Sequence, residues 1–176
     1  TDKFWMEEYH CLKDVISGTG ADVQIRCNQI WAVSLPFTML DKEKERQIVD
    51  TVFEKLYTPY GLRTLDKEDP EFQPVYGGEV LKRDLAYHQG TVWTYPLGAY
   101  YLAYLKVNGY SGGAKAYVRR QMEVLENALR EGCIGQFPEI YDGENPVSSK
   151  GCFAQAWSTG ELLRVYEALE REENFR

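Results

Sequence analysis

Carboxylates in two irregular stretches are the side chains of this sequence best suited to acid–base chemistry. The first stretch, rich in glycine and proline, carries Asp66, Glu79 and Asp84, and the second carries Glu139 and Asp142. Hydrolysis of a glycosidic bond uses two carboxyl groups, of which one donates a proton and the other acts as a base or a nucleophile. Spacing along the chain does not choose among these acids, and an ordinary loop or capping role is the simpler interpretation for each.

Residues 87–93 bring a phenol, an imidazole, an amide and an indole together at the start of a strongly apolar segment. Neutral hydrogen-bonding groups mixed with aromatic faces suit an uncharged ligand with many hydroxyl groups better than a phosphate or a metal ion. The alternative interpretation is a helix start whose polar groups satisfy one another.

Composition excludes several classes of partner. The chain of 176 residues is long enough for a single domain over residues 1–176 with a real core. Its net charge of −7 argues against nucleic acid, because phosphate binding needs a basic patch. No apolar run approaches the length of a membrane span and no signal peptide opens the chain. We therefore expect a cytoplasmic protein with no nucleic acid and no membrane partner.

Metal and cofactor binding are not predicted. The chain has two histidines, and its cysteines include no C-x-x-C pair. It also lacks the P-loop motif and the G-x-S-x-G motif of serine hydrolases. We interpret the four cysteines as reduced, packed side chains, namely Cys11, Cys27, Cys133 and Cys152.

Helical patterns cover most of the chain and predict an all-α fold. Asp41 is placed to cap an amphipathic helix that reaches Leu56, and the helix around Ala99 is apolar on nearly all sides, which predicts burial. Residues 12–16 fit a helix or a short strand, and residues 57–87 show no helical pattern. The other predicted helices are the end of one over residues 2–9, a buried one over 28–35, and those over 89–108, 114–131 and 152–171.

A glutamine followed closely by a tryptophan recurs at three predicted helix starts with nearly equal spacing. Such self-similarity predicts repeated helical hairpins with long return loops, which would place amides and indoles around one funnel. Chance recurrence is the alternative. The pairs are Gln29 with Trp31, Gln89 with Trp93, and Gln155 with Trp157.

Five short motifs follow one another in a fixed order. They are RCNQIW at residues 26–31, TPYGLRTL at 58–65, YHQGTVW at 87–93, PEIYDG at 138–143 and QAWS at 155–158. Together they resemble the C-terminal amylo-alpha-1,6-glucosidase domain of glycogen debranching enzymes, and the likeness runs from Phe4 to about Leu169. Cys27 departs from the family, which usually has proline there, and we expect this difference to alter local packing and not the chemistry.

The resemblance implies an alpha/alpha toroid that hydrolyses α-1,6-linked glucose at glycogen branch points with inversion. It implies that Glu139 is the general base and that the family's general acid is an aspartate upstream of the matched region. The chain would then hold about half of the toroid, the C-terminal part of a six-hairpin domain, and would need the upstream half of the same polypeptide as a partner.

The resemblance also implies the ligand-binding residues for an α-glucan or oligosaccharide substrate. By analogy the glucose subsite is lined by Arg63, Tyr87, His88, Gln89 and Trp93. The funnel predicted from the repeat adds Trp31, Gln155 and Trp157.

Two other functions remain open from the sequence. One is a non-catalytic glucan-binding helical module, and the other is a sugar epimerase of the same toroid architecture; a helical scaffold without a ligand is a further possibility. We expect the isolated chain to be weakly active or inactive.

Overall fold

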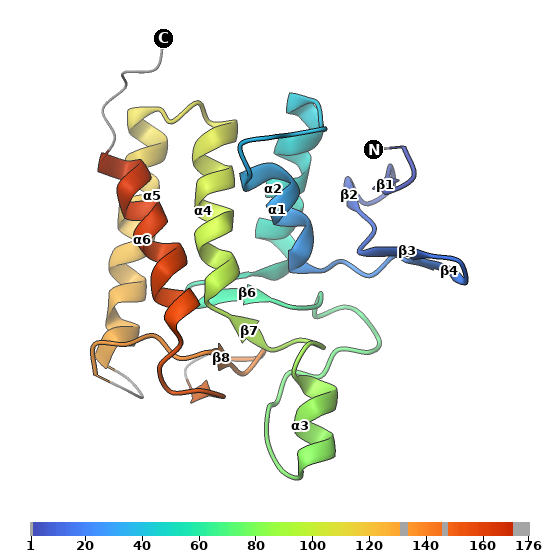
Figure 1. Cartoon of the computed structure of the whole chain (residues 1–176), viewed down its shortest axis with the longest axis vertical. Coiled ribbons are helices and arrows are strands. Elements are labelled where there is room, and N and C mark those ends of the chain that lie inside the picture. The colour runs from blue at the N-terminus through green and yellow to red at the C-terminus, as the bar shows by residue number, and fades with distance from the viewer. Residues whose placement is uncertain (1, 131–133, 146–147, 171–176) are drawn as a thin grey trace.

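The computed structural model describes residues 2–130, 134–145 and 148–170. Within this part of the chain, helices account for about 47% of the residues and short strands for 13%. The all-α prediction is therefore too narrow, because the fold is mixed. A layer of upright helices stands above a small sheet (Figure 1). The closed toroid stays a prediction.

The N-terminal region forms two antiparallel hairpins. Strand β1 (Trp5–Met6) pairs with β2 (Cys11–Leu12), and β3 (Val15–Ser17) pairs with β4 (Gly20–Asp22). The helix end predicted for residues 2–9 is therefore wrong, and residues 12–16 lie in strands on either side of a bend. A segment this short cannot nucleate a helix without tertiary support, and a turn at His10, with φ of 51°, reverses it instead. Figure 1 shows the β3–β4 hairpin projecting from the body.

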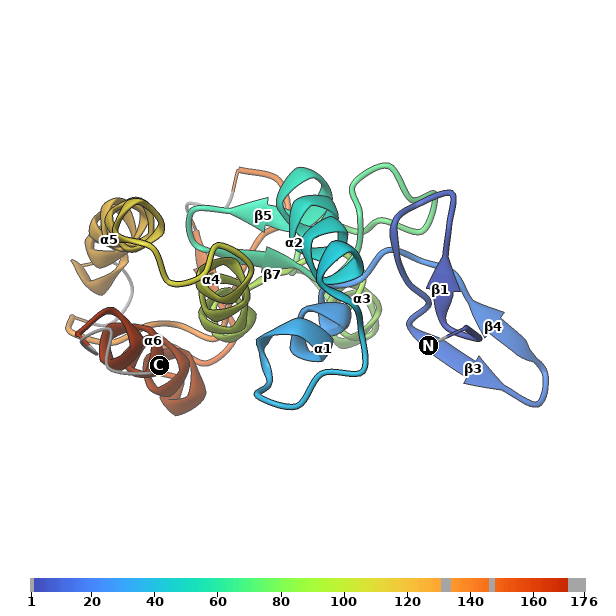
Figure 2. The same ribbon diagram turned by 90° about the horizontal axis from the view of Figure 1, so that it is seen from above.

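Five α-helices form the upright layer, with α4 at its centre (Figure 2). Helix α4 packs against α1, α2, α5 and α6. It is buried on nearly all sides, which confirms the prediction made from its apolar sequence. Gly98 permits the close approach of α6, because a Cβ there would lie 2.7 Å from the backbone oxygen of Glu161. The bounds are α1 (Trp31–Ser34), α2 (Lys42–Leu56), α4 (Tyr95–Val107), α5 (Gly112–Glu126) and α6 (Ala156–Glu170).

The ends of these helices match the predictions in part. Asp41 caps α2 as predicted, since its carboxylate accepts a hydrogen bond of 2.9 Å from the backbone N–H of Lys44. The segment before α1 is a 3-10 helix, η1 (Cys27–Ile30), so the buried helix expected over residues 28–35 is short and composite. Helix α5 gives way to a second 3-10 turn, η2 (Asn127–Arg130), and residue 131 lies outside the described chain.

A partly buried ion pair joins α4 to α2, and its cation also bonds to α1. The ammonium group of Lys106 lies 2.8 Å from a carboxylate oxygen of Glu45, which is buried. The same ammonium group donates a hydrogen bond of 2.8 Å to the backbone oxygen of Val33. One cation therefore holds three helices together at one level of the layer.

A five-stranded antiparallel sheet lies beneath the lower ends of the helices (Figure 1). Its strands follow the chain in order, and Trp93 lies opposite Ile140 in the central pair. Helix α3 (Val80–Ala86) lies below the sheet, so the expectation of no helix over residues 57–87 is wrong. The strands are β5 (Tyr57–Thr58), β6 (Gly61–Arg63), β7 (Val92–Trp93), β8 (Ile140–Tyr141) and β9 (Ser149–Lys150).

The sheet also corrects two predicted helix starts. Residues 89–94 turn and form β7 before α4 begins at Tyr95, because Gly90 takes a φ of 137° that breaks a helix. Residues 152–155 likewise precede α6, which begins at Ala156.

In the described part of the chain, none of the helices has the length and apolar character needed to cross a bilayer.

The described cysteines are free thiols. Cys11 and Cys27 are buried as expected, and burial raises the pKa of Cys11 to about 11 and that of Cys27 to about 12. Cys152 is exposed, which differs from the packed environment predicted for it. Cys133 lies outside the described residues.

Candidate active site

Three hydrogen-bond donors surround the carboxylate of Glu139, which lies immediately before β8. The Tyr87 hydroxyl donates to Oε1 at 2.6 Å, and the side-chain amide of Gln155 donates to the same oxygen at 3.1 Å. The backbone N–H of Cys152 donates to Oε2 at 3.0 Å. Because an ionised carboxylate only accepts hydrogen bonds, this set of donors matches the charged form that a general base requires.

The backbone on both sides of Glu139 is fixed as well. Its N–H donates to the backbone oxygen of Cys152 at 2.9 Å, so the two residues bond each other in both directions. The Ser158 hydroxyl, buried at the start of α6, donates to the oxygen of Pro138 at 3.2 Å. Pairing of Ile140 with Trp93 then ties the segment to the central strand. Glu139 is thus held by helix α6 and by the sheet.

Tyr87 is held in turn by its neighbours at the end of α3. Its backbone oxygen accepts hydrogen bonds from the Thr91 hydroxyl at 2.7 Å and from the Trp93 indole at 3.1 Å. Its ring packs 4.8 Å from the ring of Trp93 and 4.7 Å from that of His88. Partial burial, and then the nearby charge of Glu139, raise the pKa of Tyr87 well above its usual range. The phenol therefore stays a proton donor toward the carboxylate.

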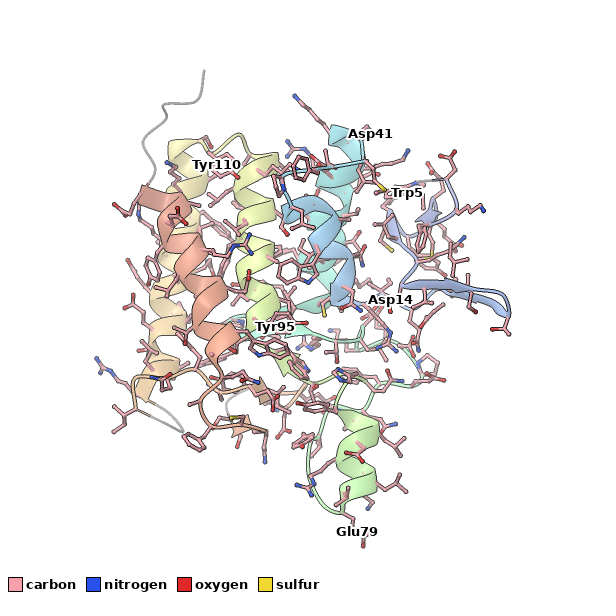
Figure 3. All side chains as sticks on the ribbon, in the orientation of Figure 1. Trp5, Asp14, Asp41, Glu79, Tyr95 and Tyr110 are labelled. Carbon is pink, nitrogen blue, oxygen red and sulfur yellow. The ribbon has the colours of Figure 1, made fainter. Side chains whose placement is uncertain are left out.

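A cavity of about 400 Å³ lies beside this cluster, between the lower ends of the helices and the β3–β4 hairpin. Its apolar wall is made of Trp93, Tyr95 and Trp157. Figure 3 shows Tyr95 at the lower end of α4 and Asp14 at the base of the hairpin. Glu139 does not line the cavity, but Tyr87 joins it to His88 and Trp93, which do.

The aromatic residues form one continuous cluster. Tyr95 stacks on Trp157 with ring centroids 4.4 Å apart and on Trp31 at 6.1 Å. Trp93 meets Trp157 edge to face at 5.8 Å and stacks on His88 at 5.2 Å. The three tryptophans of the repeat are therefore brought together. Their positions are not equivalent, because Trp93 lies in a strand and the other two lie in helices.

Charged side chains line the other wall. Arg26 donates to the backbone oxygen of His88 at 2.7 Å and to the side-chain oxygen of Gln89 at 2.5 Å, which fixes both residues at the cavity. Sequence reasoning missed Arg26 as a site residue, although it opens the first family motif. Asp84 also lines the cavity, is exposed, and has no hydrogen bond or ion pair within the described residues.

His88 is held in its neutral form more strongly than an ordinary histidine. Packing against Trp93 partly removes the ring from water although an edge stays exposed, and this desolvation lowers its pKa. The positive charge of Arg26 adds to the effect, and the negative charge of Glu139 opposes it. A neutral imidazole can both donate and accept hydrogen bonds, as recognition of a sugar hydroxyl requires.

Four of the residues predicted to bind the ligand do not line the cavity, namely Trp31, Arg63, Tyr87 and Gln155. Arg63 donates to the backbone oxygens of Gly143 at 2.9 Å and Tyr57 at 3.3 Å, so it ties the Glu139 loop to the sheet and does not line the cavity. Gln155 contacts Glu139 and not the cavity. The direct role in sugar binding proposed for these side chains stays a prediction.

The remaining candidate acids have structural partners or lie elsewhere. Asp142 accepts a hydrogen bond of 2.9 Å from the backbone N–H of Tyr76 and lies 3.9 Å from the ammonium group of Lys150. Asp66 is buried and lies 3.8 Å from Lys55. Figure 3 shows Glu79 at the far end of α3. In the described parts of the chain, no group of three or more His, Cys, Asp or Glu side chains could hold a metal ion.

The candidate site is thus a carboxylate held by three donors, next to a cavity with an aromatic wall. A family model described as amylo-alpha-1,6-glucosidase matches residues 1–164 of this 176-residue chain. The chain therefore belongs to the amylo-alpha-1,6-glucosidase family, which relates it to the glycoside hydrolases of glycogen debranching.

Proposed function

We propose that the protein hydrolyses α-1,6-linked glucose at glycogen branch points with inversion, and that Glu139 is its general base. The observation that carries the proposal is the anchoring of Glu139 by Tyr87, Gln155 and the Cys152 backbone next to an aromatic cavity. Membership of the amylo-alpha-1,6-glucosidase family supports the linkage.

In this reaction a water molecule attacks the anomeric carbon while the bond to the leaving oxygen breaks. Glu139 takes a proton from the water, and a second carboxylic acid gives a proton to the leaving oxygen. Following the family resemblance, we propose that an aspartate in an upstream part of the natural polypeptide is this acid. The sugar ring would lie on Trp157 and Tyr95, with His88 and Gln89 toward its hydroxyl groups.

The test compares Glu139→Gln with Asp142→Asn in the natural full-length polypeptide, using a branched α-glucan oligosaccharide. Glu139→Gln should lower glucose release by about 10²- to 10⁴-fold, which is the usual contribution of a general base, and should leave binding of the oligosaccharide in place. Asp142→Asn is the matched control in the same loop and should keep most of the activity. Retention of activity by Glu139→Gln would show that another group is the base.

The stereochemistry of the product gives an independent check. An inverting enzyme that cleaves an α-linkage releases β-glucose first, and proton NMR follows this anomer before mutarotation. Initial release of α-glucose would rule out inversion. Interconversion of sugar isomers without release of glucose would instead identify an epimerase.

A non-catalytic glucan-binding module is the second candidate, because Glu139 does not line the cavity itself. In that case the full-length polypeptide would bind the oligosaccharide without releasing glucose.

We also expect the 176-residue chain by itself to be weakly active or inactive, so turnover by the purified chain at the full-length rate would contradict the proposed upstream acid.

A further inference from the structure

The two oxygens of the Glu139 carboxylate have different surroundings. Each oxygen of an ionised carboxylate has two acceptor positions. Both positions on Oε1 are used, one by the Tyr87 hydroxyl and one by the Gln155 amide. Within the described residues, Oε2 accepts from the backbone N–H of Cys152 and has one position left. The carboxylate can therefore receive a further proton donor at Oε2 without losing an existing bond.

Gly151 borders the free side of Oε2. A Cβ added at this residue would lie against Oε2, closer than any real Cβ approaches an oxygen. Gly151 itself is exposed, and Glu139 is partly exposed. Because residue 151 has no side chain, none fills the space beside Oε2 at this position.

We infer that Oε2 of Glu139 takes the proton of the attacking water at the side left open by Gly151, while Tyr87 and Gln155 are positioning residues that hold Oε1. The inference rests on the proposed function. The water oxygen bonds to the anomeric carbon, one water proton passes to Oε2, and the leaving oxygen takes its proton from the second carboxylic acid. The sum is glycoside plus water giving glucose plus the free glucan hydroxyl.

The roles of Tyr87 and Gln155 follow from where their polar atoms point. Both were expected to contact the sugar, yet the hydroxyl of one and the amide of the other are directed at the carboxylate. Tyr87 is itself fixed by rings and by bonds to its backbone oxygen, so it offers the carboxylate a rigid donor. A base that is fixed before the substrate arrives needs no rearrangement during the reaction.

The first test is Gly151→Ala in the natural full-length polypeptide. The new methyl group should displace Oε2 and lower kcat by about 100-fold, with little change in KM. Gly109→Ala is the matched control, because Gly109 has nearly the same φ, 62° against 66°, and a Cβ there would meet nothing within 4 Å. Equal kcat for the two variants would overturn the role of the open side of Oε2.

The second test removes the donors to Oε1 and reads the pH profile. Tyr87→Phe and Gln155→Leu should each lower kcat by about tenfold or more and should move the acid limb of kcat toward higher pH, because fewer donors stabilise the ionised base. Tyr76→Phe is the control, since its ring lies 5.5 Å from that of Tyr87 and its hydroxyl has no bond within the described residues. A purely structural role would lower melting temperature without moving the acid limb.

The outcomes separate the inference from the function beneath it. If Glu139→Gln keeps its activity, the proposed base is wrong. If Glu139→Gln is inactive while Tyr87→Phe and Gln155→Leu keep the wild-type kcat and pH profile, the positioning roles are wrong and the base stands. If one donor variant fails to fold, the other still decides, because Tyr87 follows α3 and Gln155 precedes α6, in separate parts of the chain.

Discussion

The helical layer and the sheet end of this molecule are held together by different interactions. In the layer, α4 buries nearly every side chain, and Leu105 is 0% exposed. At the sheet end, segments next to short strands carry a hydrogen-bond network around Glu139, and Trp157 is 46% exposed. Apolar burial in the helices therefore stabilises the fold, whereas hydrogen bonds fix the position of the Glu139 carboxylate.

The largest effect on stability is expected in the layer. Leu105→Ala should lower the free energy of unfolding by about 3 kcal/mol, because it leaves a cavity in a packed core. Urea denaturation followed by fluorescence measures the loss. Glucose release by the full-length variant, assayed below its melting temperature, should stay near the wild-type rate. A large change in kcat with unchanged stability would show that Leu105 supports the active site and not the stability of the helical layer.

The ion pair between Lys106 and Glu45 is the next test of the same layer. Lys106→Met leaves the buried Glu45 carboxylate without its cation and should cost about 2 kcal/mol, less than a fully buried pair because the lysine is about a quarter exposed. Adding Glu45→Gln to Lys106→Met should recover part of this loss in a double-mutant cycle. If the losses simply add, the two side chains are not coupled.

A substitution in the cavity wall should affect ligand binding as well as stability. Trp157→Ala should lower stability by about 1 to 2 kcal/mol, less than Leu105→Ala because almost half of the side chain is already in water, but should weaken oligosaccharide binding about tenfold through loss of stacking. Isothermal titration calorimetry measures the affinity. Leu163→Ala, an exposed position on the same helix and outside the cavity, is the control and should leave affinity unchanged.

The smallest effect concerns His88 and pH. Because its pKa in the folded protein is below the ordinary value of 6.5, folding favours the neutral ring. This contribution is fully present above pH 6.5 and is lost as the pH falls through the lower folded value. The melting temperature of the wild type should therefore fall more steeply between pH 7.5 and 5.5 than that of His88→Gln. Parallel curves would show that His88 does not link stability to pH.

Sequence patterns were sufficient where a segment decides its own structure. The capping of α2 by Asp41 is a local interaction, and the burial of α4 follows from its nearly continuous apolar composition. Sequence patterns failed where the structure of a segment depends on the strand it pairs with. The N-terminal hairpins and the five-stranded sheet use strands too short for a clear alternation, and α3 is a short helix with exposed apolar residues such as Leu81.

The candidate site, too, could be predicted from the sequence only in part. The order of the five motifs indicated the family and named three residues that line the cavity, and the repeat named a fourth. These are His88, Gln89 and Trp93 from the motifs, and Trp157 from the repeat. Arg26 could have been found as a charged residue within the first motif. Its partners at His88 and Gln89 lie 62 and 63 positions away, and no spacing rule reaches that far.

The sequence by itself indicated the family and the main helices, and its resemblance to that family pointed to Glu139 among the candidate acids. The tertiary structure decided how that carboxylate is held, because its donors Tyr87 and Gln155 lie 52 and 16 positions from Glu139 along the chain. Pairing of β7 with β8 brings these groups together, with Tyr87 at the end of α3 and Gln155 just before α6. Hydrogen bonds act over about 3 Å, so only the folded arrangement distinguishes a residue that binds the sugar from a residue that positions the base.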